Sequence, residues 1–251
     1  MKVGLFIPCY VDAFFPEVGI ATLQLLERLG CEVHYPLDQT CCGQPMANSG
    51  CHGDAADTEA LFVRNFARFD HIVVPSGSCA HHVKHHLRAH ADSEGVDEVR
   101  QRTTELVTFV HDVLGVTEFP WARFPHKVAL HIGCSTLRAL GAASTSEVAG
   151  TVFNKPAKLL QAVAGVQLMP LKRPDECCGF GGTFSVFEEP VSVRMGQDKV
   201  NAQVASGAEA VVTTDMSCAM HQQGVARRLG VTMPYLHIAQ VLNGMTLEKP
   251  A

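Results

Sequence analysis

Short apolar runs alternate with amphipathic stretches along the whole chain, and each pattern has the period of one kind of secondary structure. Runs rich in Val, Ile and Leu predict strands at residues 2–8, 32–35, 71–75, 127–132, 166–169 and 210–213. Helical periodicity predicts helices in the first half at residues 17–29, 55–68 and 79–90. Strands that alternate with helices are typical of parallel sheets covered on both faces, so we expect an α/β fold.

The second half of the chain repeats the first. The matching segments keep their order: KVGLFIPC (2–9) with KVALHIGC (127–134), QTCCGQP (39–45) with DECCGFG (175–181), and HIVVPSGSCAHH (71–82) with AVVTTDMSCAMH (210–221). This order predicts two duplicated Rossmann-like halves with parallel sheets, related by a pseudo-two-fold axis. The proline-containing segment EFPWARFPH separates them, so the predicted domains are residues 1–120 and 121–251, one CCG repeat each.

Eight of the ten cysteines occupy matching positions in the two halves. They are Cys9, Cys41, Cys42 and Cys79 in the first half, and Cys134, Cys177, Cys178 and Cys218 in the second. Most of them follow a predicted strand, and open parallel sheets place their ligand crevices at the carboxyl ends of the strands. We therefore expect each half to gather its four cysteines at one sheet edge. Cys31 and Cys51 have no counterpart and are expected to be buried core residues.

The rest of the sequence indicates the cellular compartment, and the compartment limits the chemistry that these thiols can have. The apolar run at the N-terminus is too short for an export signal, and no window approaches the ~20 apolar residues of a membrane span, so we expect a cytoplasmic protein. Reducing compartments keep thiols reduced, which favours metal binding or redox chemistry over a disulfide framework. The net charge of −5 provides no basic surface for nucleic acid.

Four thiolates in each half are enough for one metal centre. Sulfur ligands in a tetrahedral arrangement suit zinc or an iron–sulfur cluster, and four cysteines are the common set for a [4Fe-4S] cluster. Adjacent cysteines diverge in an extended chain and reach one small ion awkwardly, whereas the glycine after each doublet leaves room for a bulky inorganic core. We expect one [4Fe-4S] cluster per repeat, with zinc in one or both repeats as the alternative.

Both halves place a histidine three residues after the last cysteine, at His82 and His221. On a helix this spacing puts the histidine on the same face as the cysteine. We expect these residues either to neighbour the metal group or to be ordinary helix-surface histidines. The chain has no G-x-G-x-x-G, P-loop or Ser/His/Asp pattern, so no catalytic residue is assigned.

The spacing from Cys9 through the first doublet to Cys79, repeated from Cys134 to Cys218, resembles the CCG-type cysteine-rich domain. That family includes the cysteine-rich subunit of heterodisulfide reductase and the iron–sulfur subunits of glycolate and glycerol-3-phosphate oxidases. In length, and in having two CCG repeats without a ferredoxin-like segment, the chain is similar to the lactate-utilisation branch. The resemblance implies an electron-transfer subunit that works with a ferredoxin-like iron–sulfur partner and a third subunit to oxidise L-lactate to pyruvate without NAD.

The chain departs from the heterodisulfide reductase pattern at one position in each half. That motif ends in C-x-x-C, but the first of these positions holds Ser76 in one half and Asp215 in the other. Four motif cysteines per half favour a cubane cluster over the five-cysteine, non-cubane cluster of that family. Two alternatives stay open, namely a zinc-binding scaffold without redox activity and a heterodisulfide reductase-like redox subunit.

Overall fold

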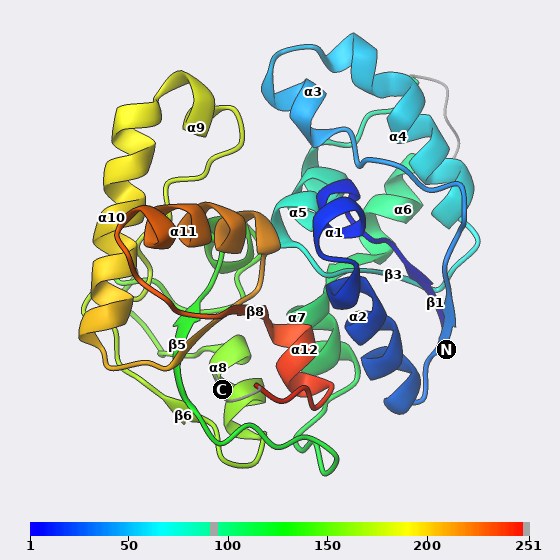
Figure 1. The fold of residues 1–251 in the computed structure, drawn as a ribbon. Helices are drawn as coiled ribbons and strands as arrows, with labels where there is room; N and C mark the ends of the chain where they lie inside the picture. The colour runs from blue at the N-terminus through cyan, green and yellow to red at the C-terminus, as the bar shows by residue number, and fades with distance from the viewer. Residues whose placement is uncertain (91–94, 248–251) are drawn as a thin grey trace.

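Two four-stranded parallel sheets form the framework of the protein, as the computed structural model of residues 1–90 and 95–247 shows (Figure 1). The first sheet has the order β2-β1-β3-β4 and contains β1 (Lys2–Leu5), β2 (Glu32–His34), β3 (His71–Val74) and β4 (Thr103–Glu105). The second has the order β6-β5-β7-β8 and contains β5 (Lys127–His131), β6 (Gln167–Leu168), β7 (Ala210–Thr213) and β8 (Tyr235–His237). The predicted duplicated α/β fold is confirmed.

Helices connect the strands in both halves, as parallel pairing requires. The first half contains α1 (Cys9–Phe14), α2 (Pro16–Arg28), α3 (Gln44–Asn48), α4 (His52–Phe66), α5 (Gly77–His86), α6 (Val96–Arg102), α7 (Leu106–Thr108) and η1 (Phe109–Val113). The second half contains η2 (Ser135–Ala139), α8 (Lys155–Gln161), α9 (Phe184–Phe187), α10 (Glu189–Ala205), α11 (Met216–Arg228) and α12 (Ile238–Leu242). No helix within the described part of the chain has the length and apolar character needed to cross a bilayer.

The six predicted strands are present, mostly shorter than expected, but the fourth strand of each sheet was not predicted. These strands, β4 and β8, have only three residues each, too few to show a period. The first strand ends before Pro8, which has no backbone N–H to donate. The predicted helix at 17–29 is α2, and the helix predicted at 79–90 starts earlier, at Gly77, and ends at His86.

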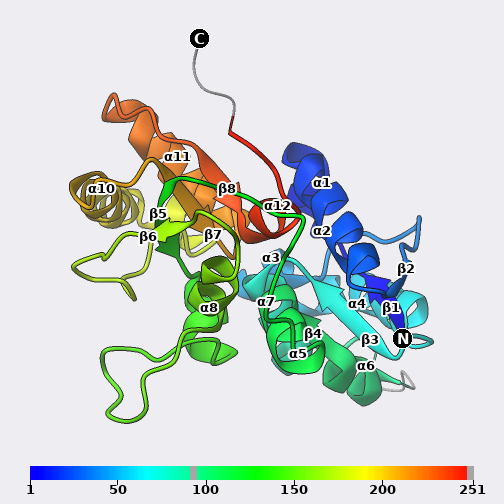
Figure 2. The same cartoon turned by 90° about the horizontal axis from the view of Figure 1, so that it is seen from below.

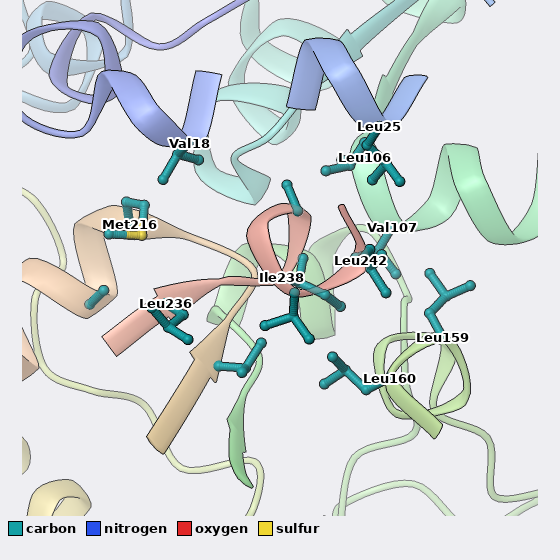
Figure 3. Packing of buried hydrophobic residues seen from close by; sticks show 14 of the residues in the cluster. Val18, Leu25, Leu106, Val107, Leu159, Leu160, Met216, Leu236, Ile238 and Leu242 are labelled. Carbon is teal, nitrogen blue, oxygen red and sulfur yellow. The ribbon is translucent and has the colours of Figure 1, made fainter. Parts of the chain in front are cut away.

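A large hydrophobic core joins the two halves, beside a smaller cluster within the first half. It includes Val3 and Val73 of the first sheet together with Val128 and Val211 of the second. At its centre α12 packs against α2, and both views show these two helices side by side (Figures 1 and 2). Ile238 and the neighbouring Leu242 of α12 lie between leucines of the two halves (Figure 3). The halves are therefore held in a defined arrangement, while their division at residue 120 stays a prediction.

Candidate metal centre

The cysteine motifs lie just beyond the carboxyl ends of the strands. In the first half Cys9 begins α1, which follows β1, and Cys79 lies in the first turn of α5, which follows β3. Cys134 and Cys218 occupy the matching places after β5 and β7. The two doublets lie in the loops that follow β2 and β6. Because the carboxyl ends of parallel strands meet at one edge, these residues converge.

Both sets of cysteines face one cavity of about 540 Å³ between the two halves. Its lining includes all eight motif residues: Cys9, Cys41, Cys42, Cys79, Cys134, Cys177, Cys178 and Cys218. Tyr10, Phe180, Val186 and Met220 add apolar surface to the lining. Sequence reasoning anticipated two separate edges, and the structure joins them into one space. The two other cysteines, Cys31 and Cys51, do not line it. Cys31 is a buried core residue as predicted, but Cys51 is exposed, so that prediction was wrong.

Each doublet is followed by a glycine in a left-handed backbone conformation. Gly43 and Gly179 both have φ of 93°, which a side chain would strain. A Cβ at Gly179 would lie 2.5 Å from the carbonyl oxygen of Ser192. In each loop the glycine N–H donates to the first sulfur of the doublet, at 3.5 Å to Cys41 Sγ and 3.4 Å to Cys177 Sγ. Each glycine therefore allows the loop to turn and places its backbone N–H within hydrogen-bond distance of the first cysteine sulfur.

Neighbouring thiols within each set contact one another in pairs, and these contacts favour a thiolate at the first cysteine of each doublet. Hydrogen bonds donated by Cys42 and Cys9 lower the pKa of Cys41 to about 2. Hydrogen bonds donated by Cys134 and Cys178 lower the pKa of Cys177 to about 2 in the same way.

The pKa of the second cysteine of each doublet shifts in the opposite direction. The hydrogen bond to Cys41 raises the pKa of Cys42, and the hydrogen bond to Cys177 raises the pKa of Cys178. Each set therefore combines a thiol whose pKa is lowered with neighbours whose pKa is raised. Further deprotonation needs a cation, because neighbouring thiolates repel one another.

Asp215 connects the two halves at the edge of the cavity. Its carboxylate is 2% exposed and accepts hydrogen bonds from Tyr10 Oη at 2.9 Å and from Ser76 Oγ at 2.9 Å, both in the first half. It also accepts from the backbone N–H and hydroxyl of Ser78, and from those of Ser217 at the start of α11. The two residues that replace a motif cysteine, Ser76 and Asp215, therefore bind each other.

His82 and His221 lie behind the CCG loops and do not line the cavity. His82 is buried, and its Nε2 donates to Glu59 at 3.1 Å. His221 Nε2 donates to the carbonyl oxygen of Ser192 at 3.3 Å. A Cβ added to Gly43 would lie 3.4 Å from His82 Nε2, so this ring packs directly under its loop. Their predicted role beside the metal group is untested.

Sequence reasoning missed His131, the last residue of β5. Its side chain is buried, and neither ring nitrogen has a hydrogen-bond partner among the described residues. Burial lowers the pKa of His131 to about 3, which keeps the ring neutral. A ring nitrogen and the sulfurs of Cys178 and Cys218 all lie within 4.8 Å of one another. The sequence does contain a signal that could have identified His131. When KVALHIGC is aligned with KVGLFIPC, His131 stands where the first half has Phe6.

The donor set suits a sulfur-ligated metal group. Each half offers four thiols that face the cavity, a first doublet cysteine whose pKa is lowered, and a backbone N–H directed at its sulfur. Thiolates bind zinc and the iron of iron–sulfur clusters, and N–H donors to sulfur stabilise both. The cavity between the sets is large enough for an inorganic core.

Comparisons with known proteins agree with this architecture. A family profile described as a cysteine-rich domain, CCG, matches residues 3–84 and 128–222. Lactate utilization protein A of Geobacillus kaustophilus is 40% identical over 247 residues, which cover 97% of this chain and 99% of that protein. Lactate utilization protein A of Macrococcus caseolyticus is 39% identical and covers 97% of this chain and 96% of that protein.

A solved structure shares the fold. A hypothetical protein from Helicobacter pylori superposes with a TM-score of 0.56 at 9% identity, covering 96% of this chain and 48% of that longer chain. At this identity the likeness concerns the fold alone. The profile match over both repeats and the full-length relatives show that the chain belongs to the CCG cysteine-rich family that includes the lactate utilization A proteins.

Proposed function

We propose that this chain is an iron–sulfur electron-transfer subunit of a multi-protein system that oxidises L-lactate to pyruvate. The observation that carries the proposal is the convergence of two matching four-cysteine sets on one cavity. Full-length relatives named for lactate utilisation support the choice of substrate. One [4Fe-4S] cluster per repeat matches the number of motif cysteines.

The chain's own residues would hold and shield the metal groups. Cys9, Cys41, Cys42 and Cys79 would bind one group, and Cys134, Cys177, Cys178 and Cys218 the other. A bound iron–sulfur cluster supplies reversible uptake of one electron at a time. The N–H groups of Gly43 and Gly179 would reduce the charge on the sulfurs that they contact, and Tyr10 and Phe180 would cover part of the cavity wall.

The same proposal assigns the organic step to other proteins of the system. The described residues around the cavity are mostly thiols and apolar side chains, with no basic residue among them to bind a carboxylate substrate. We therefore place lactate binding on a partner, with a ferredoxin-like iron–sulfur protein and a third subunit completing a cytoplasmic, NAD-independent oxidoreductase. The CCG subunit would receive the electrons.

A zinc-binding scaffold is the second candidate, and one observation favours it. The ring of His131 and the sulfurs of Cys178 and Cys218 lie within 4.8 Å of one another, a compact group that suits a single ion. In this alternative the second repeat holds zinc, and the chain organises its partners without carrying electrons.

Metal analysis of anaerobically purified protein separates the two candidates. The proposal expects iron and acid-labile sulfide in similar amounts and an EPR signal on reduction. Stoichiometric zinc without sulfide contradicts it. The substrate is tested by adding L-lactate to the chain mixed with its lactate-oxidising partner proteins: the signal should appear with L-lactate and not with D-lactate or without the partners.

A further inference from the structure

His131 is a buried polar side chain whose ring nitrogens make no hydrogen bond to any of the residues that the structure describes. Its exposed fraction is 1%, and both Nδ1 and Nε2 lack a hydrogen-bond partner within the described part of the chain. Leaving a buried donor or acceptor unpaired costs ~1–3 kcal/mol, and such groups in folded proteins usually have a ligand, a water or an ion as partner. The other histidines that sequence reasoning singled out, His82 and His221, each have a hydrogen-bond partner.

The surroundings of His131 suit a cation as its partner. One ring nitrogen and the sulfurs of Cys178 and Cys218 lie within 4.8 Å of one another, the one such group of three among residues 1–90 and 95–247. Nitrogen and sulfur atoms bound to one ion at ~2.0–2.3 Å are roughly 3.5–4 Å apart, so small side-chain movements would close the group around a metal. Cys178 and Cys218 are both buried, with exposed fractions of 2% and 7%.

The first repeat cannot form this arrangement. The matching residue, Phe6, has its ring 4.8 Å from the ring of Phe62 and 5.8 Å from that of Phe66. This aromatic cluster fills the space beside Cys42 with carbon. The duplicated cysteines therefore lie in two different settings, one with an imidazole and one without.

We propose that His131 is a metal ligand alongside Cys178 and Cys218, so that the second repeat binds its metal group through nitrogen and sulfur and the first repeat through sulfur alone. The inference rests on the proposed function only for the metal-binding role of the cysteines, and it holds for iron or for zinc. Where the neutral imidazole takes a coordination position that a thiolate fills in the first repeat, the metal group of the second repeat carries less negative charge.

The test is a Co²⁺ titration of the anaerobic, metal-free full chain, because the visible bands of Co²⁺ report the ligand type. The double substitution Cys41→Ser/Cys42→Ser leaves only the second set, and Cys177→Ser/Cys178→Ser leaves only the first. We expect the second set to give Co²⁺ bands at higher energy than the first, because imidazole is a stronger-field ligand than thiolate. His131→Phe, which copies Phe6, should shift these bands to those of the first set.

The control is His131→Phe in the background that retains only the first set, where the Co²⁺ bands should not move. His131→Gln keeps the polarity of the site and serves as the test if the Phe variant does not fold. Bands that are unchanged by either substitution overturn the inference. Iron and sulfide analysis remains a separate measurement, so a failure of the iron–sulfur proposal and a failure of the His131 proposal give different results.

Discussion

The two repeats share their strand order and their four cysteine positions, but they differ in the charged groups buried behind the CCG loops. The first repeat has Glu59 there, 3% exposed, which accepts hydrogen bonds from His82 and from two backbone N–H groups at 2.7 Å. The second has Lys199, fully buried, whose Nζ donates to the carbonyl oxygen of Pro174 at 3.1 Å. The duplication thus keeps the candidate ligands and changes the electrostatic surroundings of each candidate metal site.

Buried charges of opposite sign act in opposite directions on a metal group. A nearby carboxylate disfavours the added electron, and a nearby ammonium favours it. Burial lowers the pKa of Lys199, and the nearby Glu176 and Cys178 oppose that effect. We therefore expect the second repeat to hold the more easily reduced metal group, a difference that His131 reinforces.

Substituting one cysteine doublet at a time should have the largest effect on the difference between the repeats. Cys41→Ser/Cys42→Ser should abolish metal binding in the first repeat, and Cys177→Ser/Cys178→Ser should abolish it in the second, because each removes two of four thiols. Each variant should retain about half of the bound metal, measured per chain after anaerobic purification. Cys31→Ser is the control and should retain all of it. Complete loss in either double variant would mean that the two sets form a single site.

The pH dependence of stability should also differ between the repeats. Glu105 ends β4, accepts a hydrogen bond from Val107 N–H at 2.9 Å, and has its pKa raised to about 8 by burial. A carboxyl with a raised pKa holds its proton more tightly in the folded state, so stability falls as pH rises from about 4.5 to 8. In Glu105→Gln, the loss of unfolding free energy between pH 5 and pH 9 should be smaller by up to about 4 kcal/mol. Urea unfolding of metal-free protein at the two pH values measures it.

The matching residue of the second repeat, His237, should give the opposite dependence. It ends β8, accepts from Ala239 N–H at 3.2 Å, and has its pKa lowered to about 4 by burial. Its neutral form is favoured by folding, so stability is lost as pH falls from about 6.5 to 4. His237→Asn keeps a capping acceptor and should flatten this acid decline. If either variant kept the wild-type dependence of stability on pH, the assignment of that dependence to Glu105 or His237 would be wrong.

Asp215→Asn tests the connection between the repeats. The substitution removes a charge that four hydroxyl and backbone donors of the first half share, and it brings an NH₂ group toward them. We expect the free energy of unfolding to fall by about 3 kcal/mol in metal-free protein. Ser76→Ala removes a single donor of the same network and should cost about 1 kcal/mol. If both variants lost the same free energy of unfolding, the carboxylate of Asp215 would not be the main source of stability in this network.

Neutralising the buried charges should produce the smallest effect. Lys199→Met should lower the reduction potential of the second repeat's cluster, and Glu59→Gln should raise that of the first, each by tens of millivolts. Potentiometric titration followed by EPR measures both. Lys158→Met, at a more distant lysine of α8, is the control and should leave both potentials unchanged. Shifts in the same direction for both variants would contradict the electrostatic comparison.

Several features of the fold follow from the local sequence. The apolar runs predict six of the eight strands, and the repeated segments predict the duplication, because both are patterns within short windows. The positions of the cysteines after strands predict that each set converges. The three-residue strands β4 and β8 escape prediction, since they form only because a longer neighbouring strand offers its edge.

What the sequence determined by itself is therefore the duplicated α/β framework and the two sets of thiols. The tertiary structure decided that both sets share one cavity, that Asp215 bonds to Tyr10, 205 residues away, and that His131 lies unpaired beside Cys178 and Cys218 among the residues described. These features depend on how α2 and α12 pack the halves together. Periodicity within a segment carries no information about which distant segment it will meet, because that choice is made by the burial of side chains from both halves in one core.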